Sequence, residues 1–317
     1  MIRFGSILTM TFSLGKIRSS RRTHVGFALA LLVTMAIGWH PLRMLLDAAL
    51  RHERNSHVLL VLPVAIGLLF LEGKGHSATP RFAPGAGAAI LLLALSIAAL
   101  CVARTSALGP STLLSLRILS LGIAWLGLFM LFYGPQIFRQ SLFPLLFLLL
   151  LVPLPDMLLD KVIHLLQYGS TRVTQALFIL SGIPVAREGF ILFLPKIDIE
   201  VAAECSGIRS SMMLFLTTLV LGHLFLRGAW RQVGLFLSVF AITIFKNALR
   251  IFTLSTLAMY VDPVWIEGDF HHRYAGSVFF LVAISMILLV LYLLRRSEQG
   301  RRFTALTARV HPTENLT

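Results

Sequence analysis

Three kinds of side chain in this sequence could together perform covalent chemistry on an acyl group. They are the thiol of Cys205, the guanidinium of Arg250 and the imidazole of His271 or His272. A neighbouring cation favours the nucleophilic thiolate over the thiol. An imidazole can exchange a proton with the thiol and then with a leaving amine. A guanidinium can stabilise the oxyanion of a tetrahedral intermediate or hold a substrate carbonyl or carboxylate. These residue types therefore predict a cysteine nucleophile that attacks a carbonyl.

The elements that must position these residues are membrane helices. Of the 317 residues, 57% are hydrophobic and only 13% are charged, whereas a soluble domain of this length carries more charge. Apolar runs of spanning length predict an all-α polytopic membrane protein with about eight transmembrane helices. We expect one integral membrane domain over 1–317, with spans near 25–39, 57–71, 85–103, 111–133, 142–155, 205–226, 233–261 and 276–294.

The segment between the fifth and sixth spans, 156–204, has a different pattern. Residues 157–181 place apolar side chains at helical spacing with charged residues between them, which predicts an amphipathic helix at the membrane interface. Residues 190–194 and 197–201 are separated by Pro195-Lys196, and the second run alternates apolar and polar residues. This pattern predicts a short β-hairpin that leads the chain to Cys205.

The distribution of Lys and Arg predicts the orientation. With the N-terminus placed inside, fifteen basic residues lie in inside segments, nine lie in outside segments and four lie within spans. This bias favours a topology with both termini inside. The amphipathic helix, the hairpin and Cys205 are then extracytoplasmic. Because orientation explains the net charge of +14, and no aromatic residues interleave a basic stripe, we expect the lipid bilayer as a partner and no nucleic acid.

The predicted spans bring the reactive groups to one depth. Lys246 and Arg250 are four residues apart, so they lie on one face of the seventh span. At about 1.5 Å per residue, Arg250 lies roughly 25 Å above the start of that span, near the outer surface. Cys205 begins the sixth span at the same surface, and the histidine pair precedes the eighth.

Metal and cofactor chemistry is not indicated. The only cysteines are Cys101 and Cys205, which is too few for a Cys-rich metal site. Cys101 lies within an apolar run, where a cysteine is usually a small apolar residue. The sequence has no phosphate-binding loop and no GxSxG elbow. We expect no metal and no cofactor.

Three segments of the chain resemble the signatures of exosortases and archaeosortases. They are Glu204-Cys205-Ser206-Gly207-Ile208-Arg209-Ser210-Ser211, Asn247-Ala248-Leu249-Arg250-Ile251 and His272-Arg273-Tyr274-Ala275-Gly276. The resemblance implies an eight-span cysteine protease or transpeptidase in the bacterial cytoplasmic (inner) membrane, with its active site on the outer side. Its substrates would be secreted proteins with a C-terminal sorting signal: a short motif, often Pro-Glu-Pro, then a transmembrane helix and a basic tail. Cleavage near the motif would pass the acyl group to an acceptor nucleophile that the sequence does not identify.

The resemblance also assigns roles to individual residues. It implies Cys205 as the nucleophile, Arg250 as the transition-state stabiliser and His272 as the acid/base. His271 stays the alternative for the last role, because a pair of histidines stands where the family has one; the following His-x-x-x-Gly spacing fits His272. The residues expected to support the site are Glu204, Ser206, Arg209 and Asn247.

Two other classes of function remain open at this stage. The chain could be a membrane component of exopolysaccharide export or assembly without peptidase activity, which predicts inverted repeats and broken helices with polar residues at mid-depth. It could also be a non-catalytic scaffold, which would have no use for Cys, Arg and His side chains at one depth. Replacing Cys205 by Ala separates these classes, because only the enzyme must lose activity.

Overall fold

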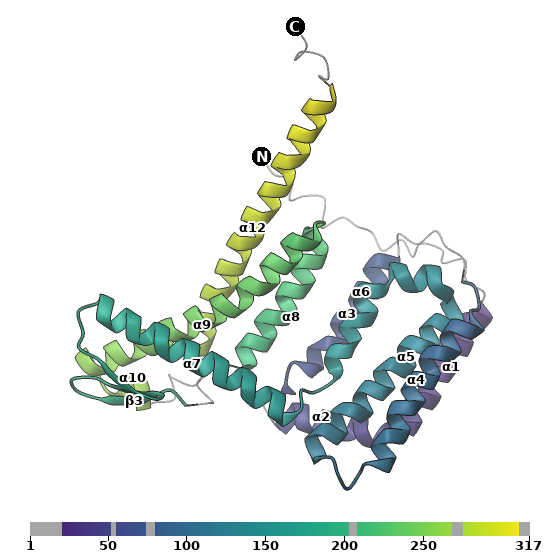
Figure 1. The fold of residues 1–317 in the computed structure, drawn as a ribbon, viewed down its shortest axis with the longest axis horizontal. Coiled ribbons are helices and arrows are strands. Elements are labelled where there is room, and N and C mark those ends of the chain that lie inside the picture. Colours follow the sequence, from purple (N-terminus) through teal and green to yellow (C-terminus); the bar gives the residue numbers. More distant parts are fainter. Residues whose placement is uncertain (1–20, 52–54, 74–79, 203–207, 268–274, 311–317) are drawn as a thin grey trace. The chain divides into compact units, whose positions relative to one another are not determined.

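The computed structural model describes residues 21–51, 55–73, 80–202, 208–267 and 275–310. The described chain is mostly helical, with one small sheet (Figure 1). It divides into two compact units, Met1–Asp156 and Met157–Thr317, which are described separately below. The expectation of one integral membrane domain stays a prediction.

The first unit contains six described α-helices and a short 3-10 turn. They are α1 (Arg21–Ile37), α2 (Trp39–Arg51), α3 (Val58–Gly73), α4 (Pro84–Ala103), α5 (Pro110–Gln140), α6 (Leu142–Phe147) and the turn Leu148–Leu151. Helices α1 and α4 both pack on α5. The first span was predicted to end at residue 39, and there the chain bends by 75° and continues as α2. The amphipathic residues of α2 bury Leu45 and Ala49, which explains the helix.

Helix α5 extends past the predicted end at residue 133 and contains a break. Gly134 has φ +80°, and Pro135 has no N–H to continue the helical ladder. The carbonyls freed near the break accept hydrogen bonds from the extended segment before α4. Arg81 N donates to Tyr133 O at 3.3 Å, and Ala83 N donates to Leu131 O at 3.0 Å. The backbone carbonyls at the break are therefore hydrogen-bonded, and the segment before α4 packs closely against it.

The second unit is built from three long helices that lie side by side. They are α8 (Ile208–Phe225), α9 (Ala229–Tyr260) and α12 (Ala275–Val310) (Figure 1). Their shared core contains apolar side chains from all three helices, among them Leu214, Leu235 and Ile287. Phe215 of α8 and Phe236 of α9 add an edge-on aromatic contact. A short helix, α10 (Val264–Glu267), follows α9 and packs on it.

Helix α7 (Asp156–Leu180) and a three-stranded antiparallel sheet complete this unit. The strands are β1 (Ala186–Glu188), β2 (Ile191–Phe193) and β3 (Asp198–Glu200), in the order β1-β2-β3. The central pairs are Arg187 with Leu192 and Leu192 with Ile199. The predicted hairpin is confirmed as β2 and β3. Strand β1 was not predicted, because its residues Ala186-Arg187-Glu188 show no alternation of apolar and polar side chains.

The inner face of the sheet covers the ends of α7 and α9. Leu192 and Val201 are buried with Phe178 of α7 and Met259 of α9. The rings of Phe178 and Phe252 are 5.0 Å apart. Alternation in β2 therefore places Leu192 inward and leaves Ile191 and Phe193 on the outer face. The sheet is a small cap on these two helices.

The described helices support a multi-pass membrane protein with four to six candidate spans. Four helices are long and apolar enough to cross a bilayer: 84–103, 110–140, 229–260 and 276–298. Two bent pairs, 22–37 with 39–51 and 142–151 with 156–180, raise the number to six if each is one span. Helix α3 and residues 210–225 are shorter apolar helices, so the predicted count of eight is not confirmed.

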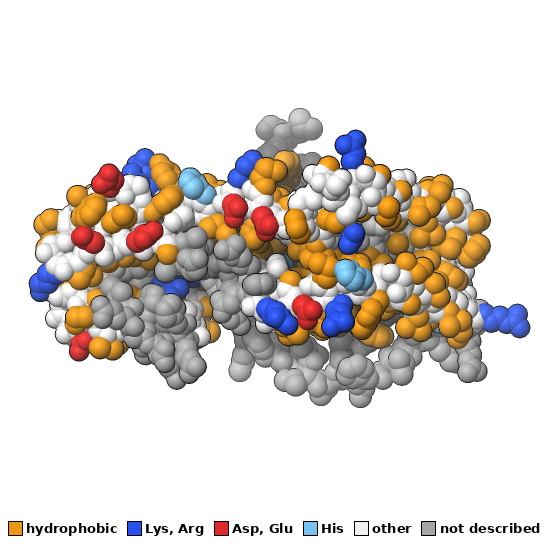
Figure 2. Space-filling view, turned by 90° about the horizontal axis from the view of Figure 1, so that it is seen from below, with side chains coloured by type: hydrophobic (Ala, Val, Ile, Leu, Met, Phe, Trp, Pro, Cys, Tyr) orange, Lys and Arg blue, Asp and Glu red, His pale blue; other side chains and the backbone are white. Residues whose placement is uncertain are grey.

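Exposed apolar side chains agree with a lipid environment. On α4, Leu92 and Leu95 are 63% and 64% exposed. Figure 2 shows hydrophobic side chains crowded at the right of the visible face, whereas charged side chains lie mainly at its left and centre. Water would penalise so much exposed apolar surface, whereas lipid does not.

Candidate functional site

The candidate site is built on one stretch of α9 that carries Lys246, Asn247 and Arg250. Lys246 is 4% exposed and Asn247 is fully buried, while Arg250 is partly buried. Neither α8 nor α9 contains an acidic residue. Charged and amide side chains within a spanning helix are costly and therefore rare unless they serve a function.

Asn247 joins α9 to α7. Its Nδ2 donates to Ser170 Oγ at 3.2 Å, and both side chains are fully buried. One turn further along α7, Thr174 Oγ1 donates to Ala248 O at 3.4 Å. Small residues let the two helices approach closely; a Cβ added to Gly169 would lie 2.8 Å from Ile244 Cδ1. This crossing fixes the level of Asn247 against α7.

Lys246 joins α9 to α8 at the same level. Its Nζ donates to Ser210 Oγ at 2.6 Å, and Ser210 lies in the first turn of α8. Consecutive residues of a helix point about 100° apart. Lys246 and Asn247 therefore reach two different neighbouring helices, and Arg250 follows one turn later.

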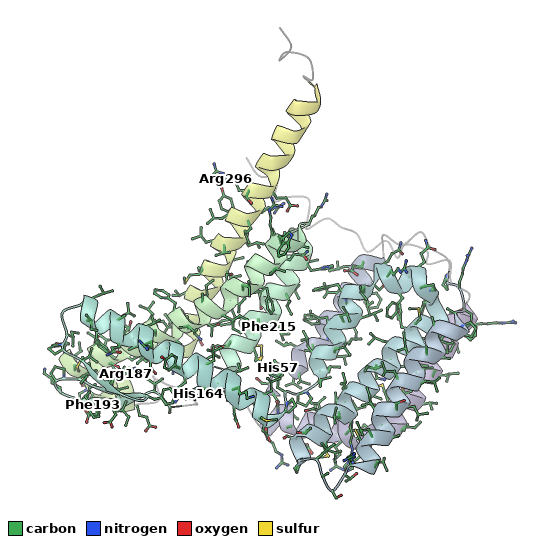
Figure 3. All side chains as sticks on the ribbon, viewed as in Figure 1. His57, His164, Arg187, Phe193, Phe215 and Arg296 are labelled. Atoms are coloured by element: carbon green, nitrogen blue, oxygen red, sulfur yellow. The ribbon has the colours of Figure 1, made fainter. Side chains whose placement is uncertain are left out.

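Three further contacts hold the sheet and the residues next to it against α7 and α9. Lys196 Nζ donates to Met259 O at 3.0 Å, where it binds a carbonyl in the last turn of α9. Gln167 Nε2 of α7 donates to Val201 O. On α7, His164 packs edge-on against Phe190 with ring centroids 5.3 Å apart. Figure 3 labels His164 on α7 and Arg187 and Phe193 on the sheet.

Several of the predicted site residues lie outside the described residues. These are Glu204, Cys205, Ser206, His271 and His272. Arg209 lies in the first turn of α8, and its side chain is also outside the described part. Of the predicted set, the structure describes the side chains of Asn247 and Arg250, three residues apart on α9. The catalytic assembly of Cys205, Arg250 and His272 stays a prediction.

Other predicted features can be examined in the described residues. Cys101 is buried on α4 with 1% exposure, as expected of a small apolar residue. Among the described residues, no group of three His, Cys, Asp or Glu side chains could hold a metal ion.

The partners of Asn247 and Lys246 were not predicted from the sequence. Ser170 lies on a helix that we predicted to lie at the interface, and Ser210 had no assigned role. One signal was available: Gly169, Ser170 and Thr174 are small residues at helical spacing, a pattern typical of close helix–helix packing in membranes. No comparable signal marks Ser210 as the partner of Lys246.

The fold and the polar stretch of α9 define a multi-pass membrane protein with a buried polar site. A family model described as transmembrane exosortase matches residues 46–289, which include all of α3 to α10 and the beginning of α12. The chain belongs to the transmembrane exosortase family. A comparison with curated proteins and one with solved structures gave no significant match.

Proposed function

We propose that this chain is a cysteine peptidase or transpeptidase that cleaves C-terminal sorting signals of exported proteins at the outer face of the bacterial cytoplasmic membrane. Membership of the exosortase family supports the general class. The observation that carries the proposal is the polar stretch of α9, in which Lys246 and Asn247 hold two neighbouring helices one turn before Arg250. Because these bonds hold α9 in place, the guanidinium of Arg250 is suited to stabilising negative charge at one fixed position in the transition state.

In the proposed reaction, Cys205 attacks the scissile carbonyl and His272 accepts the thiol proton. Arg250 stabilises the oxyanion of the tetrahedral intermediate. His272 then gives the proton to the leaving amine, the C–N bond breaks, and the substrate remains as a thioester on Cys205. An acceptor nucleophile or water attacks that thioester and releases the thiol. The acyl group thus passes to the acceptor without any change in oxidation state.

The flanks of Cys205 support its partnership with Arg250. In the sequence, Cys205 stands four residues after Val201 and five before Ser210. Val201 is bonded to Gln167 of α7, and Ser210 is bonded to Lys246 of α9. These two hydrogen bonds flank Cys205 in the sequence. They favour a position of its thiol close to Arg250 on α9.

Charge also supports this assignment. Lys246 and Arg250 are two cations four residues apart on a helix without acidic residues. In a low-dielectric setting, two such cations favour a negative group nearby. A thiolate and a developing oxyanion are the negative groups that the proposed reaction supplies.

The break in α5 bears on the alternative of an export component. Transporters use the free carbonyls of broken helices to bind substrates or ions. Here the carbonyls of Leu131 and Tyr133 are bonded to Ala83 N and Arg81 N. This break therefore does not favour the alternative over the peptidase.

The test is processing of a reporter protein that ends in a Pro-Glu-Pro motif, a transmembrane helix and a basic tail. We expect Cys205→Ala and Arg250→Ala to abolish processing while the variants remain in the membrane. Arg250→Lys should also fail or nearly so, because a point charge does not reproduce the planar fork of a guanidinium. Cys101→Ala is the matched control and should process normally. Full processing by Cys205→Ala would exclude the proposed chemistry.

A further inference from the structure

The pair Lys246–Ser210 is a costly feature to which the proposed reaction assigns no step. Lys246 is 4% exposed in a spanning helix, and its amine donates to Ser210 Oγ at 2.6 Å. Leucine or methionine would fill this position at far lower cost. The presence of a buried amine at position 246 therefore suggests that it has a function.

We infer that Lys246 is a positioning residue for the reaction, acting through Ser210. This inference rests on the proposed function. The bond ties the first turn of α8 to α9 one turn before Arg250. Since the chain carrying the nucleophile enters α8 at this turn, the bond sets the start of α8 relative to the guanidinium. A misplacement of about 1 Å at such a point can cost roughly 100-fold in rate.

The surroundings of Lys246 argue against direct contact with substrate. The side chain is almost completely buried, and its Nζ is engaged by Ser210. Lys246 and Arg250 therefore have different roles in the proposed reaction. Lys246 holds α8, while Arg250, which is partly buried, keeps the catalytic role proposed above.

Asn247 strengthens the inference because it repeats the arrangement on the other side. Its bond to Ser170 ties α9 to α7 at the same level. Helix α9 is thus held by side-chain hydrogen bonds to both neighbours immediately before Arg250. Loss of the α8 contact would leave the α7 contact intact, so we expect a change in geometry and not a loss of the fold.

The experiment compares Ser210→Ala, Ser210→Thr and Lys246→Met on the same reporter protein in reconstituted membranes. We expect Ser210→Ala and Lys246→Met each to lower kcat about tenfold or more with KM unchanged, the loss expected when a charge-assisted hydrogen bond is removed. Ser210→Thr keeps the hydroxyl and should restore most of the rate. The double variant should be no slower than the slower single variant.

The matched control is Thr218→Ala on the same helix. Thr218 is 1% exposed, and its hydroxyl donates to Leu214 O within α8. This variant should lose a buried hydroxyl without changing kcat. If Lys246→Met does not insert, Ser210→Ala decides the question alone.

The failure of this inference can be told apart from failure of the proposed function. Processing by Cys205→Ala would remove the proposed function and the inference with it. An inactive Cys205→Ala together with wild-type kcat in Ser210→Ala would overturn only the positioning role. Equal losses in Ser210→Ala and Thr218→Ala, matched by equal falls in melting temperature, would also overturn it, since they would indicate packing alone.

Discussion

Lys246 and Asn247 are adjacent polar residues whose side chains serve different helices. The amide of Asn247 meets Ser170 on α7, and the amine of Lys246 meets Ser210 on α8. The Asn247–Ser170 bond is buried and the Lys246–Ser210 bond is partly buried. An unsatisfied polar group in a buried position would cost about 1–3 kcal/mol. At the scale of residues, these pairs hold α9 to both neighbours one turn before Arg250, whose catalytic role is a proposal.

The histidine pair gives the residue-scale prediction. We predict that the pair enters the eighth span in helical conformation, in which adjacent residues point about 100° apart, so that only one of the two imidazoles faces the thiol. His272 has the spacing to Gly276 that the family resemblance requires, and small residues there allow close packing of helices. We expect His272→Ala to abolish processing and His271→Ala to retain a substantial fraction. The measurement is reporter cleavage at equal amounts of membrane-inserted enzyme; the reverse ranking would move the acid/base role to His271.

Among the elements, α5 depends on a single backbone conformation. Gly134 adopts φ +80°, and an added Cβ would lie 2.4 Å from Arg81 O. A side chain at this position would therefore be strained twice, by the backbone and by the contact. The segment from Arg81 to Ala83, which supplies the donors for the break, would have to move.

We therefore expect Gly134→Ala to destabilise the protein by about 1–3 kcal/mol or more. The measurement is the melting temperature of the purified protein in detergent. Gly67→Ala on α3 is the matched control, because nothing lies within 4 Å of its added Cβ. That control should be neutral or slightly stabilising, since Ala favours helix more than Gly does. Equal melting temperatures for wild type and Gly134→Ala would show that the break is not required.

For the whole molecule, the topology is the property on which the proposed function depends. We predict that both termini are inside and that Cys205 is extracytoplasmic. A membrane-impermeant thiol reagent applied to cells without an outer barrier should label Cys205 and spare Cys101, which is 1% exposed. A denatured sample should label at both cysteines and serves as the control. Labelling of Cys205 only after the membrane is breached would reverse the topology.

Hydrophobicity along the chain was enough to locate most of the helices. The predicted span 85–103 is α4 (Pro84–Ala103), and 233–261 corresponds to α9 (Ala229–Tyr260). These predictions succeed because a bilayer requires long apolar runs with internally satisfied backbone bonds. The hairpin of β2 and β3 could also be predicted, because the alternation of its apolar and polar residues is a local sequence pattern. The family motifs also single out Asn247 and Arg250 in the sequence, and the roles of both residues stay predictions.

Features that depend on packing could not be predicted in this way. Helix α2 and the break in α5 arise where the chain meets other segments of its unit. The partners of Lys246 and Asn247 lie 36 and 77 residues away in the sequence. A helical period determines which residues share a face, but not which distant side chain that face will meet. Only the packing of α7 and α8 against α9 decided that Lys246 binds Ser210 and Asn247 binds Ser170.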